Sequence, residues 1–295
     1  MFENLVYTNL VEAKKLVGVS YLGNVAHSAK LLHSLSNGTA TYCLYLAPSD
    51  LSGYNVCPNG KYCKDFCLFT SGHNFMDIRK QMASNNDMDL SIISSKITRS
   101  RIIKTKLFFE NRTFFMRWLI DEIRIAKLTA EVNGYDFSVR LNGTSDIKVT
   151  DFELNGECIL DIFKDVQFYD YTKVYPYLAL TKKFSNYDIT YSYNGYNWSL
   201  CEQALKSGYR VSVVFEKVRA KKGKLVREQQ ILPKTFKGYK VINGDNSDIR
   251  YVEPSGVIVG LEFKQTAQAV KDGKNITPDT QFIVKRNNTD CYWGK

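Results

Sequence analysis

The chain has 295 residues, of which 44% are hydrophobic and 24% charged, a composition typical of a folded globular protein and not of a disordered one. Its 40 Lys and Arg residues outnumber its 30 Asp and Glu residues, and the resulting net charge of +10 suits a polyanionic partner. No apolar run approaches the roughly 20 residues that a membrane-spanning helix requires, and the N-terminus resembles no signal peptide, so we expect a protein of the cytoplasm.

The N-terminal part of the sequence predicts an extension followed by a strand and a long loop. Residues 1–38 are mixed in character and end in the turn signal Ser36-Asn37-Gly38. Residues 39–46 are β-branched and aromatic, which favours a strand. The loop that follows, residues 49–74, is called the cysteine loop here; loops of this length inside a domain are usually functional. We expect residues 39–295 to form a single α/β domain.

Two helices are predicted after this loop. The first covers a mixed basic segment, residues 88–106. The second covers Thr113–Val132, in which apolar residues recur at the spacing of one helix face. Asn111 or Thr113 can cap its start, and Gly134 stands where a left-handed residue commonly ends a helix.

Beyond Gly134, short β-rich runs alternate with helical or mixed stretches, which predicts βα units and a mostly parallel sheet. The predicted strands are Phe137–Leu141, Val166–Tyr169, Asp188–Ser192, Arg210–Phe215, Tyr239–Ile242, Val257–Leu261 and Gln281–Val284. With residues 39–46 they favour a full or partial (β/α) barrel, and an open sheet is the alternative. Residues 218–227 are expected to form a basic hairpin.

Polar residues gather at the C-terminal ends of these strands. The clearest group is Asn142-Gly143-Thr144-Ser145-Asp146, called the acidic turn here. Because ligands of parallel α/β folds bind beyond the C-terminal ends of the strands, we expect these groups to share one edge with the cysteine loop. The candidate catalytic residues are Asp146, Asp170, Lys173, Asp245 and Asp248, and the candidate cofactor-binding residues are Asn142, Gly143, Ser145, Ser192 and Arg250. The alternative is that each serves an ordinary turn or helix cap.

Three of the seven cysteines, Cys57, Cys63 and Cys67, lie within eleven residues of the cysteine loop. In a cytoplasmic protein such a group indicates metal or redox chemistry more than a disulfide framework, since thiolates bind soft metals strongly. One interpretation is a [4Fe–4S] cluster with one iron open to a small ligand. Another is a zinc ion, with His73 or Cys43 as the fourth ligand. The third is an adventitious disulfide or reduced thiols in the core.

Basic and aromatic residues make a nucleic acid or nucleotide an expected partner. The segment Lys96–Lys106 carries five cations in eleven residues and, with the basic hairpin, could follow a phosphate backbone. Tyrosines near the strand ends could stack on a base; these are Tyr169, Tyr171, Tyr191, Tyr193 and Tyr196. The alternative for the charges is a solvated helix face. No membrane partner is expected.

Taken in order, these motifs resemble a phage protein family related to the gene product 88 proteins. The resemblance covers residues from about 39 to 284. The segments that carry it are Asn55-Val-Cys-Pro58 with Cys63 and Cys67-Leu68, Arg140–Asp146, Phe168–Lys173, Val241–Asp245 and Asp248-Ile-Arg250. It implies a phage protein in the cytoplasm of an infected host cell, and it implies no particular activity.

More distantly, the layout is similar to that of radical S-adenosylmethionine enzymes. In those enzymes three cysteines after the first strand hold a [4Fe–4S] cluster, and a Gly-rich acidic turn after the second strand binds the methionine amine. The resemblance implies that Cys57, Cys63 and Cys67 hold the cluster and that the acidic turn binds the cofactor. The cysteine spacing departs from that pattern, because five and three residues separate the cysteines here and three and two are usual there.

Three functions follow from these observations. The first is a phage-encoded, radical-SAM-like metalloenzyme acting on a nucleotide or nucleic acid, with a [4Fe–4S] cluster and S-adenosylmethionine as cofactors. The second is a zinc-stabilised protein that modifies or binds nucleic acid. The third is a non-enzymatic phage protein that binds a host factor.

Overall fold

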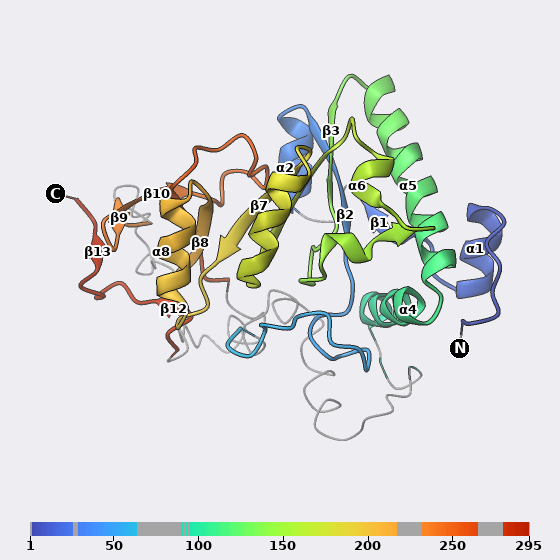
Figure 1. Cartoon of the computed structure of the whole chain (residues 1–295), viewed down its shortest axis with the longest axis horizontal. Coiled ribbons are helices and arrows are strands. Elements are labelled where there is room, and N and C mark those ends of the chain that lie inside the picture. Colours follow the sequence, from blue (N-terminus) through green and yellow to red (C-terminus); the bar gives the residue numbers. More distant parts are fainter. Residues whose placement is uncertain are drawn as a thin grey trace, which may run out of the picture.

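The computed structural model describes residues 2–25, 29–63, 90, 93, 95–216, 232–264 and 280–294. Within these residues one eleven-stranded sheet organises the chain (Figure 1), in the order β1–β2–β3–β6–β7–β8–β11–β10–β9–β13 with β12 beside β8. The strands are β1 (Gly23–Asn24), β2 (Thr39–Leu44), β3 (Asp136–Arg140), β6 (Gln167–Thr172), β7 (Tyr187–Ser192), β8 (Arg210–Phe215), β9 (Thr235–Phe236), β10 (Tyr239–Asn243), β11 (Ile258–Glu262), β12 (Ile283–Val284) and β13 (Cys291–Tyr292). A separate hairpin pairs β4 (Glu153–Leu154) with β5 (Glu157–Cys158).

The sheet is mostly parallel, as predicted. Strands β2, β3, β6, β7, β8 and β11 lie side by side in chain order, and every pairing between neighbours is parallel. Strand β10 also pairs in parallel with β11, and β12 pairs in parallel with β8. The pairs β1–β2, β9–β10 and β9–β13 are antiparallel. The prediction of a full barrel is wrong for the described strands, because β1 and β13 stand at opposite ends of the sheet and do not pair.

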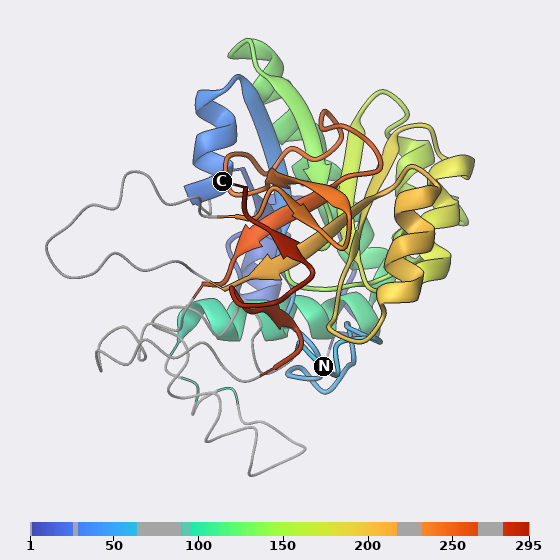
Figure 2. The same ribbon diagram turned by 90° about the vertical axis from the view of Figure 1, so that its left-hand side faces the viewer.

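Helices cover the sheet on both sides, and Figure 2 shows α2 (blue) and α8 (gold) on opposite sides. The helices are α1 (Leu10–Val17), α2 (Ala29–Ser36), α4 (Lys96–Glu110), α5 (Arg112–Val132), α6 (Ile159–Ile162), α7 (Leu180–Lys183) and α8 (Trp198–Lys206), with 3-10 turns η4 (Val149–Asp151) and η5 (Tyr175–Ala179). No helix in the described ranges is both long enough and apolar enough to cross a membrane.

The long helix α5 begins close to where the sequence predicts it. The Asn111 side chain accepts a hydrogen bond from the backbone N–H of Phe114 at 3.0 Å, which satisfies one of the free amides at the helix start. The preceding helix, α4, covers residues 96–110, whereas residues 88–106 were predicted. It begins later because Ser95 caps it through the Thr98 N–H, and it continues up to Asn111.

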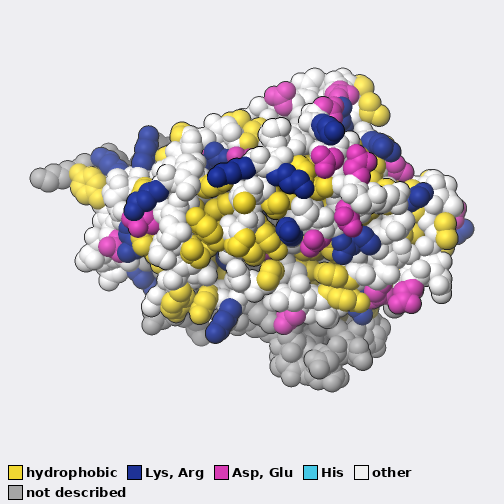
Figure 3. Space-filling model, viewed as in Figure 1, with side chains coloured by type: hydrophobic (Ala, Val, Ile, Leu, Met, Phe, Trp, Pro, Cys, Tyr) yellow, Lys and Arg dark blue, Asp and Glu magenta, His cyan; other side chains and the backbone are white. Residues whose placement is uncertain are grey.

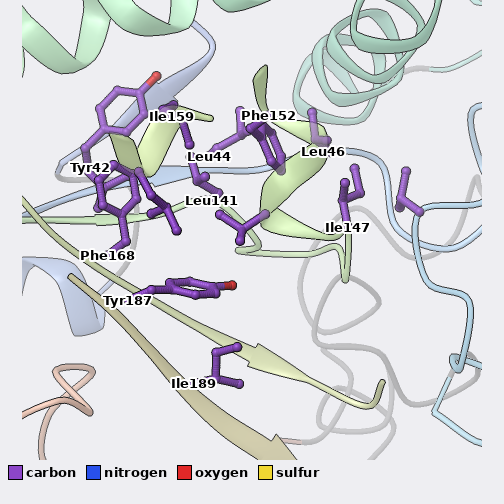
Figure 4. Packing of buried hydrophobic residues seen from close by; sticks show 14 of the residues in the cluster. Tyr42, Leu44, Leu46, Leu141, Ile147, Phe152, Ile159, Phe168, Tyr187 and Ile189 are labelled. Carbon is purple, nitrogen blue, oxygen red and sulfur yellow. The ribbon is translucent and has the colours of Figure 1, made fainter. Parts of the chain in front are cut away.

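One face of the sheet forms the main hydrophobic core. Side chains that alternate along β2, β3, β6 and β7 point to this face, and Figure 4 shows them packed together with residues of the connecting segments. The labelled members are Tyr42, Leu44, Leu46, Leu141, Ile147, Phe152, Ile159, Phe168, Tyr187 and Ile189. Burying an aliphatic or phenyl side chain contributes about 1.5–3 kcal/mol. This core therefore fixes where the C-terminal ends of the strands lie.

The N-terminal residues are attached to the same core. Ala13, Val17 and Leu22 are buried members of it. The Glu122 carboxylate on α5 accepts hydrogen bonds from the backbone N–H groups of Leu22 (2.9 Å) and Gly23 (3.1 Å). The Lys104 ammonium on α4 donates to the Leu22 carbonyl at 2.8 Å. Opposite charges on two helices thus hold the segment that leads into β1.

Candidate functional site

The segment that joins β2 to the cysteine loop is anchored to α4. The backbone N–H of Ala47 donates to the hydroxyl of Thr105, a buried residue of α4, at 2.9 Å. The loop then closes a turn, in which the Val56 N–H donates to the Ser49 carbonyl at 2.9 Å. Its described part ends at residue 63, so Cys67 and His73 lie outside the described residues. The predicted basic hairpin, residues 218–227, lies outside them too.

Cys57 and Cys63 stand on two consecutive turns that share Gly60. The Gly60 N–H donates to the Cys57 carbonyl at 2.9 Å, and the Cys63 N–H donates to the Gly60 carbonyl at 3.1 Å. A Cβ atom at Gly60 would lie 3.1 Å from the Cβ of Cys57, tighter than ordinary packing. Glycine therefore lets the chain fold closely around the first cysteine. Both cysteine side chains are half-buried.

The Cys57 sulfur contacts both the first residue of the cysteine loop and the acidic turn. The Ser49 N–H donates to its Sγ at 3.4 Å, and the same Sγ is 3.9 Å from the Thr144 carbonyl oxygen. The Cys57 thiol is the donor in the contact with the Thr144 carbonyl, so the sulfur accepts from one segment and donates to the other. The contact joins two segments 87 residues apart in the sequence.

The acidic turn packs directly against the end of β2. The Gly143 N–H donates to the Leu44 carbonyl at 3.0 Å. A Cβ atom at Gly143 would lie 2.7 Å from that carbonyl oxygen and 2.8 Å from the sulfur of Cys43. Only glycine fits so close an approach. Burial raises the pKa of the Cys43 thiol to about 12, so this thiol is protonated at neutral pH.

Hydrogen bonds to Asp170 of β6 and within the turn itself, through Asn142, hold the acidic turn in place. The Asp170 carboxylate accepts hydrogen bonds from the Asn142 backbone N–H (2.8 Å), the Asn142 side-chain amide (3.2 Å) and the Tyr187 hydroxyl (3.3 Å). The Asn142 side-chain oxygen accepts from the Ser145 hydroxyl at 2.7 Å and from the Ile147 N–H at 2.9 Å. Burial raises the pKa of Asp170 to about 7, although the bonds from Asn142 oppose this rise.

Asp170 does not lie where the sequence places it. Strand β6 continues to Thr172, so Asp170 is a buried strand residue and not part of a turn after the strand. The strand is longer than predicted because Tyr169, Tyr171 and Thr172, all good strand formers, pair with β7.

Asp146 ties the acidic turn to the end of β6. Its carboxylate accepts a hydrogen bond from the Thr172 hydroxyl at 2.6 Å and one from the Lys173 backbone N–H at 2.8 Å. Its own N–H donates to the Val56 carbonyl at 2.8 Å, next to Cys57. Burial raises the pKa of Asp146, and the bonds from Thr172 and Lys173 oppose that rise.

The cysteine loop also reaches the ends of β6 and β7. The Asn59 side-chain amide donates to the Lys173 carbonyl at 2.9 Å. The rings of Tyr62 and Tyr196 pack with centroids 4.3 Å apart, and Tyr196 belongs to the connection after β7. The structure therefore brings the cysteine loop against the segments that follow β3, β6 and β7, the edge of the sheet at which the sequence predicts a site.

The remaining candidates lie on the other side of the sheet or on a separate turn. Asp248 pairs with Arg140 of β3 at 2.9 Å and accepts a long hydrogen bond from the Tyr169 hydroxyl at 3.4 Å. Asp245 accepts from the Glu262 N–H at 2.7 Å, beyond β10.

Arg250 and Ser192 are both buried. The Arg250 guanidinium pairs with Glu253 at 2.6 Å, and the Ser192 hydroxyl accepts from that of Ser212 at 3.1 Å. Both side chains therefore interact with other parts of the protein. Within the described residues, neither forms a hydrogen bond or ion pair with Asp146 or Asp170.

Sequence reasoning missed three residues that shape the site: Thr172, Asn59 and Tyr62. Each makes its contact with a residue distant in the chain, so no local pattern identifies it. Thr172 carried a weak signal, since it lies in the short polar segment that follows the predicted strand Val166–Tyr169. Asn59 carried a signal as well, because an Asn in a Gly- and Pro-rich loop commonly bonds backbone groups.

The basic segment on α4 does not form one continuous charged face. Lys104 is buried against Leu22, and the Arg101 guanidinium lies over the Tyr45 ring, 5.1 Å from its centroid. Lys96 is exposed. On the face that carries α5 to α8, Figure 3 shows Lys and Arg side chains interspersed with Asp and Glu. A nucleic acid partner therefore stays a prediction.

No three His, Cys, Asp or Glu side chains converge on a possible metal position in the part of the chain that the structure describes. That part lacks Cys67 and His73. No curated protein and no solved structure is significantly similar to the chain. The gene product 88 family model, in contrast, matches residues 12–278. The match supports the family resemblance of the motifs and lends no support to the radical SAM layout. The chain belongs to the gene product 88 family of phage proteins.

Proposed function

We propose that this phage protein is a metalloenzyme of the host cytoplasm in which Cys57, Cys63 and Cys67 hold a [4Fe–4S] cluster. In this proposal the curved parallel sheet is a partial (β/α) barrel with a radical-SAM-like layout. S-adenosylmethionine is the cofactor, and the substrate is a nucleotide or nucleic acid.

The observation that carries the proposal is the contact between the cysteine loop and the acidic turn. The Cys57 sulfur is 3.9 Å from the Thr144 carbonyl oxygen, and the Asp146 N–H donates to the Val56 carbonyl at 2.8 Å. A cysteine loop after one strand thus packs on a Gly-containing acidic turn after the next strand. The consecutive parallel order of β2, β3, β6, β7, β8 and β11 supports the same layout.

The two described thiols suit an iron–sulfur cluster. They are soft donors on adjoining turns, Gly60 allows the close fold, and the Ser49 amide points at the Cys57 sulfur. When bound, such a cluster supplies one-electron chemistry that the side chains around it do not provide themselves. A zinc ion would use the same thiols as structural ligands.

In this account the buried carboxylates position the site and do not act on substrate. Asp170 and Asp146 together accept five hydrogen bonds from the acidic turn, from the end of β6 with the residue after it, and from β7. These bonds fix the backbone of residues 142–146 beside Cys57. A rigid backbone of this kind can bind a small polar ligand without reorganising. Lys173, whose backbone amide is bound to Asp146, lies at the same rim and is the candidate to contact an anionic substrate.

The test measures iron, acid-labile sulfide and visible absorption in protein prepared without oxygen. The samples are the wild type and the Cys57→Ser, Cys63→Ser and Cys67→Ser variants. Cys291→Ser is the matched control, because Cys291 is also half-buried but lies on β13. We expect iron, acid-labile sulfide and visible absorption in the wild type and control, and their loss in the three loop variants. Stoichiometric zinc without sulfide would replace this proposal with the zinc-stabilised alternative. Folded wild-type protein free of both metals would refute both.

A further inference from the structure

The rings of Tyr62 and Tyr196 form an exposed aromatic pair at the rim of the proposed site. Tyr62 is 37% exposed and Tyr196 is 58% exposed, although the two rings pack against each other with an interplanar angle of 37°. Tyr62 immediately precedes Cys63 in the chain. The pair therefore offers aromatic surface to solvent beside the cysteine loop.

Both tyrosines are carried by tight, hydrogen-bonded turns. The Asn194 side chain accepts from the backbone N–H groups of Tyr196 (2.9 Å) and Asn197 (3.1 Å). The Asn197 side chain in turn accepts from the Asn194 N–H at 2.8 Å. Tyr62 lies in the turn closed by the Cys63 N–H and the Gly60 carbonyl, at 3.1 Å. Because the backbone is already ordered, a ligand that stacks here loses little free energy in ordering the protein.

The charge beside the rings fits a polyanion. The Lys61 ammonium lies 5.4 Å from the centroid of the Tyr62 ring, so one short segment offers a flat ring and a cation. Single-stranded nucleic acids are bound by this combination, in which bases stack on aromatic rings and phosphates meet nearby cations. The net charge of +10 acts in the same direction at longer range.

We propose that Tyr62 and Tyr196 form a stacking platform for the bases of a single-stranded nucleic acid, with Lys61 facing its phosphates. This inference rests on the proposed function, because it names the substrate class that would reach the cysteine loop. It differs in part from the sequence-based prediction. Tyr196 was among the expected stacking tyrosines and Tyr62 was not, whereas Tyr169 and Tyr191, which were expected, are fully buried.

The test measures the affinity of oxygen-free protein for a fluorescein-labelled oligothymidylate of about 12 nucleotides by fluorescence anisotropy. We expect Tyr62→Ala and Tyr196→Ala each to weaken binding about 5- to 150-fold, since stacking is worth about 1–3 kcal/mol per base. Tyr62→Phe and Tyr196→Phe, which keep the ring, should bind within about twofold of wild type if stacking is the interaction. Lys61→Ala removes one phosphate contact, so the fall of log K with log salt concentration should become shallower by about 0.7.

Tyr292→Ala is the matched control, because Tyr292 is 57% exposed but lies on β13. It should bind like the wild type, and circular dichroism confirms that each variant is folded. Wild-type protein that does not bind the oligonucleotide, or alanine variants that bind as well as the control, would overturn the platform. If thymidine monophosphate competes as well as the unlabelled oligonucleotide, the two rings bind a free nucleotide, and the proposal of a single-stranded nucleic acid ligand is overturned.

Iron and sulfide are measured on the same samples. Iron-free protein that binds through the two tyrosines would contradict the proposed function and leave the platform standing. Iron-containing protein whose binding ignores the tyrosines would contradict the platform alone.

Discussion

The buried carboxyl of Asp170 gives the clearest prediction of how this site affects stability. Its folded-state pKa is about 7, raised by burial from the ordinary value of 3.8. Between these two pH values the folded chain holds a proton that the unfolded chain releases. The contribution of Asp170 to the free energy of unfolding therefore falls as pH rises from about 4 to about 7 and does not change above that range.

The size of this effect follows from the same two pKa values. A tenfold change in proton affinity corresponds to about 1.4 kcal/mol, so moving the pKa from 3.8 to about 7 lowers stability above pH 7 by about 4 kcal/mol. Asp170→Asn removes the titrating group and keeps the shape of the side chain. Its stability relative to wild type should therefore improve by about that amount between pH 4 and pH 8.

The assay is urea unfolding of wild type and Asp170→Asn at pH values from 4 to 8. Asp136→Asn is the matched control, because Asp136 is an exposed carboxyl at the start of the neighbouring strand β3. The control should track the wild type at every pH. A constant difference between Asp170→Asn and wild type over the whole range would show that Asp170 is ionised in the fold throughout, and the reasoning would be wrong.

Three further predictions concern close packing and buried charge. Gly143→Ala should destabilise the fold by about 1–3 kcal/mol in urea unfolding, because its Cβ would lie 2.7 Å from the Leu44 carbonyl; an unchanged midpoint would contradict this. Asp248→Ala should cost about 3 kcal/mol, because the Arg140 guanidinium loses its partner, and an Arg140→Met/Asp248→Leu double variant should recover part of that loss. Burial lowers the pKa of Lys104 to about 8 from 10.5, so between these pH values the unfolded chain binds more protons than the folded chain. The stability of the wild type relative to Lys104→Met should therefore rise by about 3 kcal/mol over this range. Urea unfolding at pH 8 and pH 10.5 measures the difference.

The local elements were largely readable from the sequence. The spacing of apolar residues predicts α5 to within one residue at its start, and the run Arg210–Phe215 coincides with β8. Both segments have strong periodicity or strand-forming residues along their whole length. The end of β6 was less readable, because a buried Asp in a strand requires partners that only tertiary structure supplies.

The candidate site was readable in its parts but not in its assembly. The sequence places the acidic turn and the cysteine loop after neighbouring strands, which predicts that they lie at one edge of the sheet. It does not predict that Asp170 would hold the turn from within β6, or that Tyr62 would meet Tyr196. Such contacts depend on how the strands pair and curve, and the pairing is set by packing over the whole core.

The central claim is that the cysteine loop holds an iron–sulfur cluster. The most direct measurement is the iron, zinc and acid-labile sulfide content of the wild-type protein, purified and assayed without oxygen. We predict iron and sulfide in equal amounts, at the stoichiometry of one [4Fe–4S] cluster per chain. Folded protein that contains neither iron nor sulfide would contradict the claim.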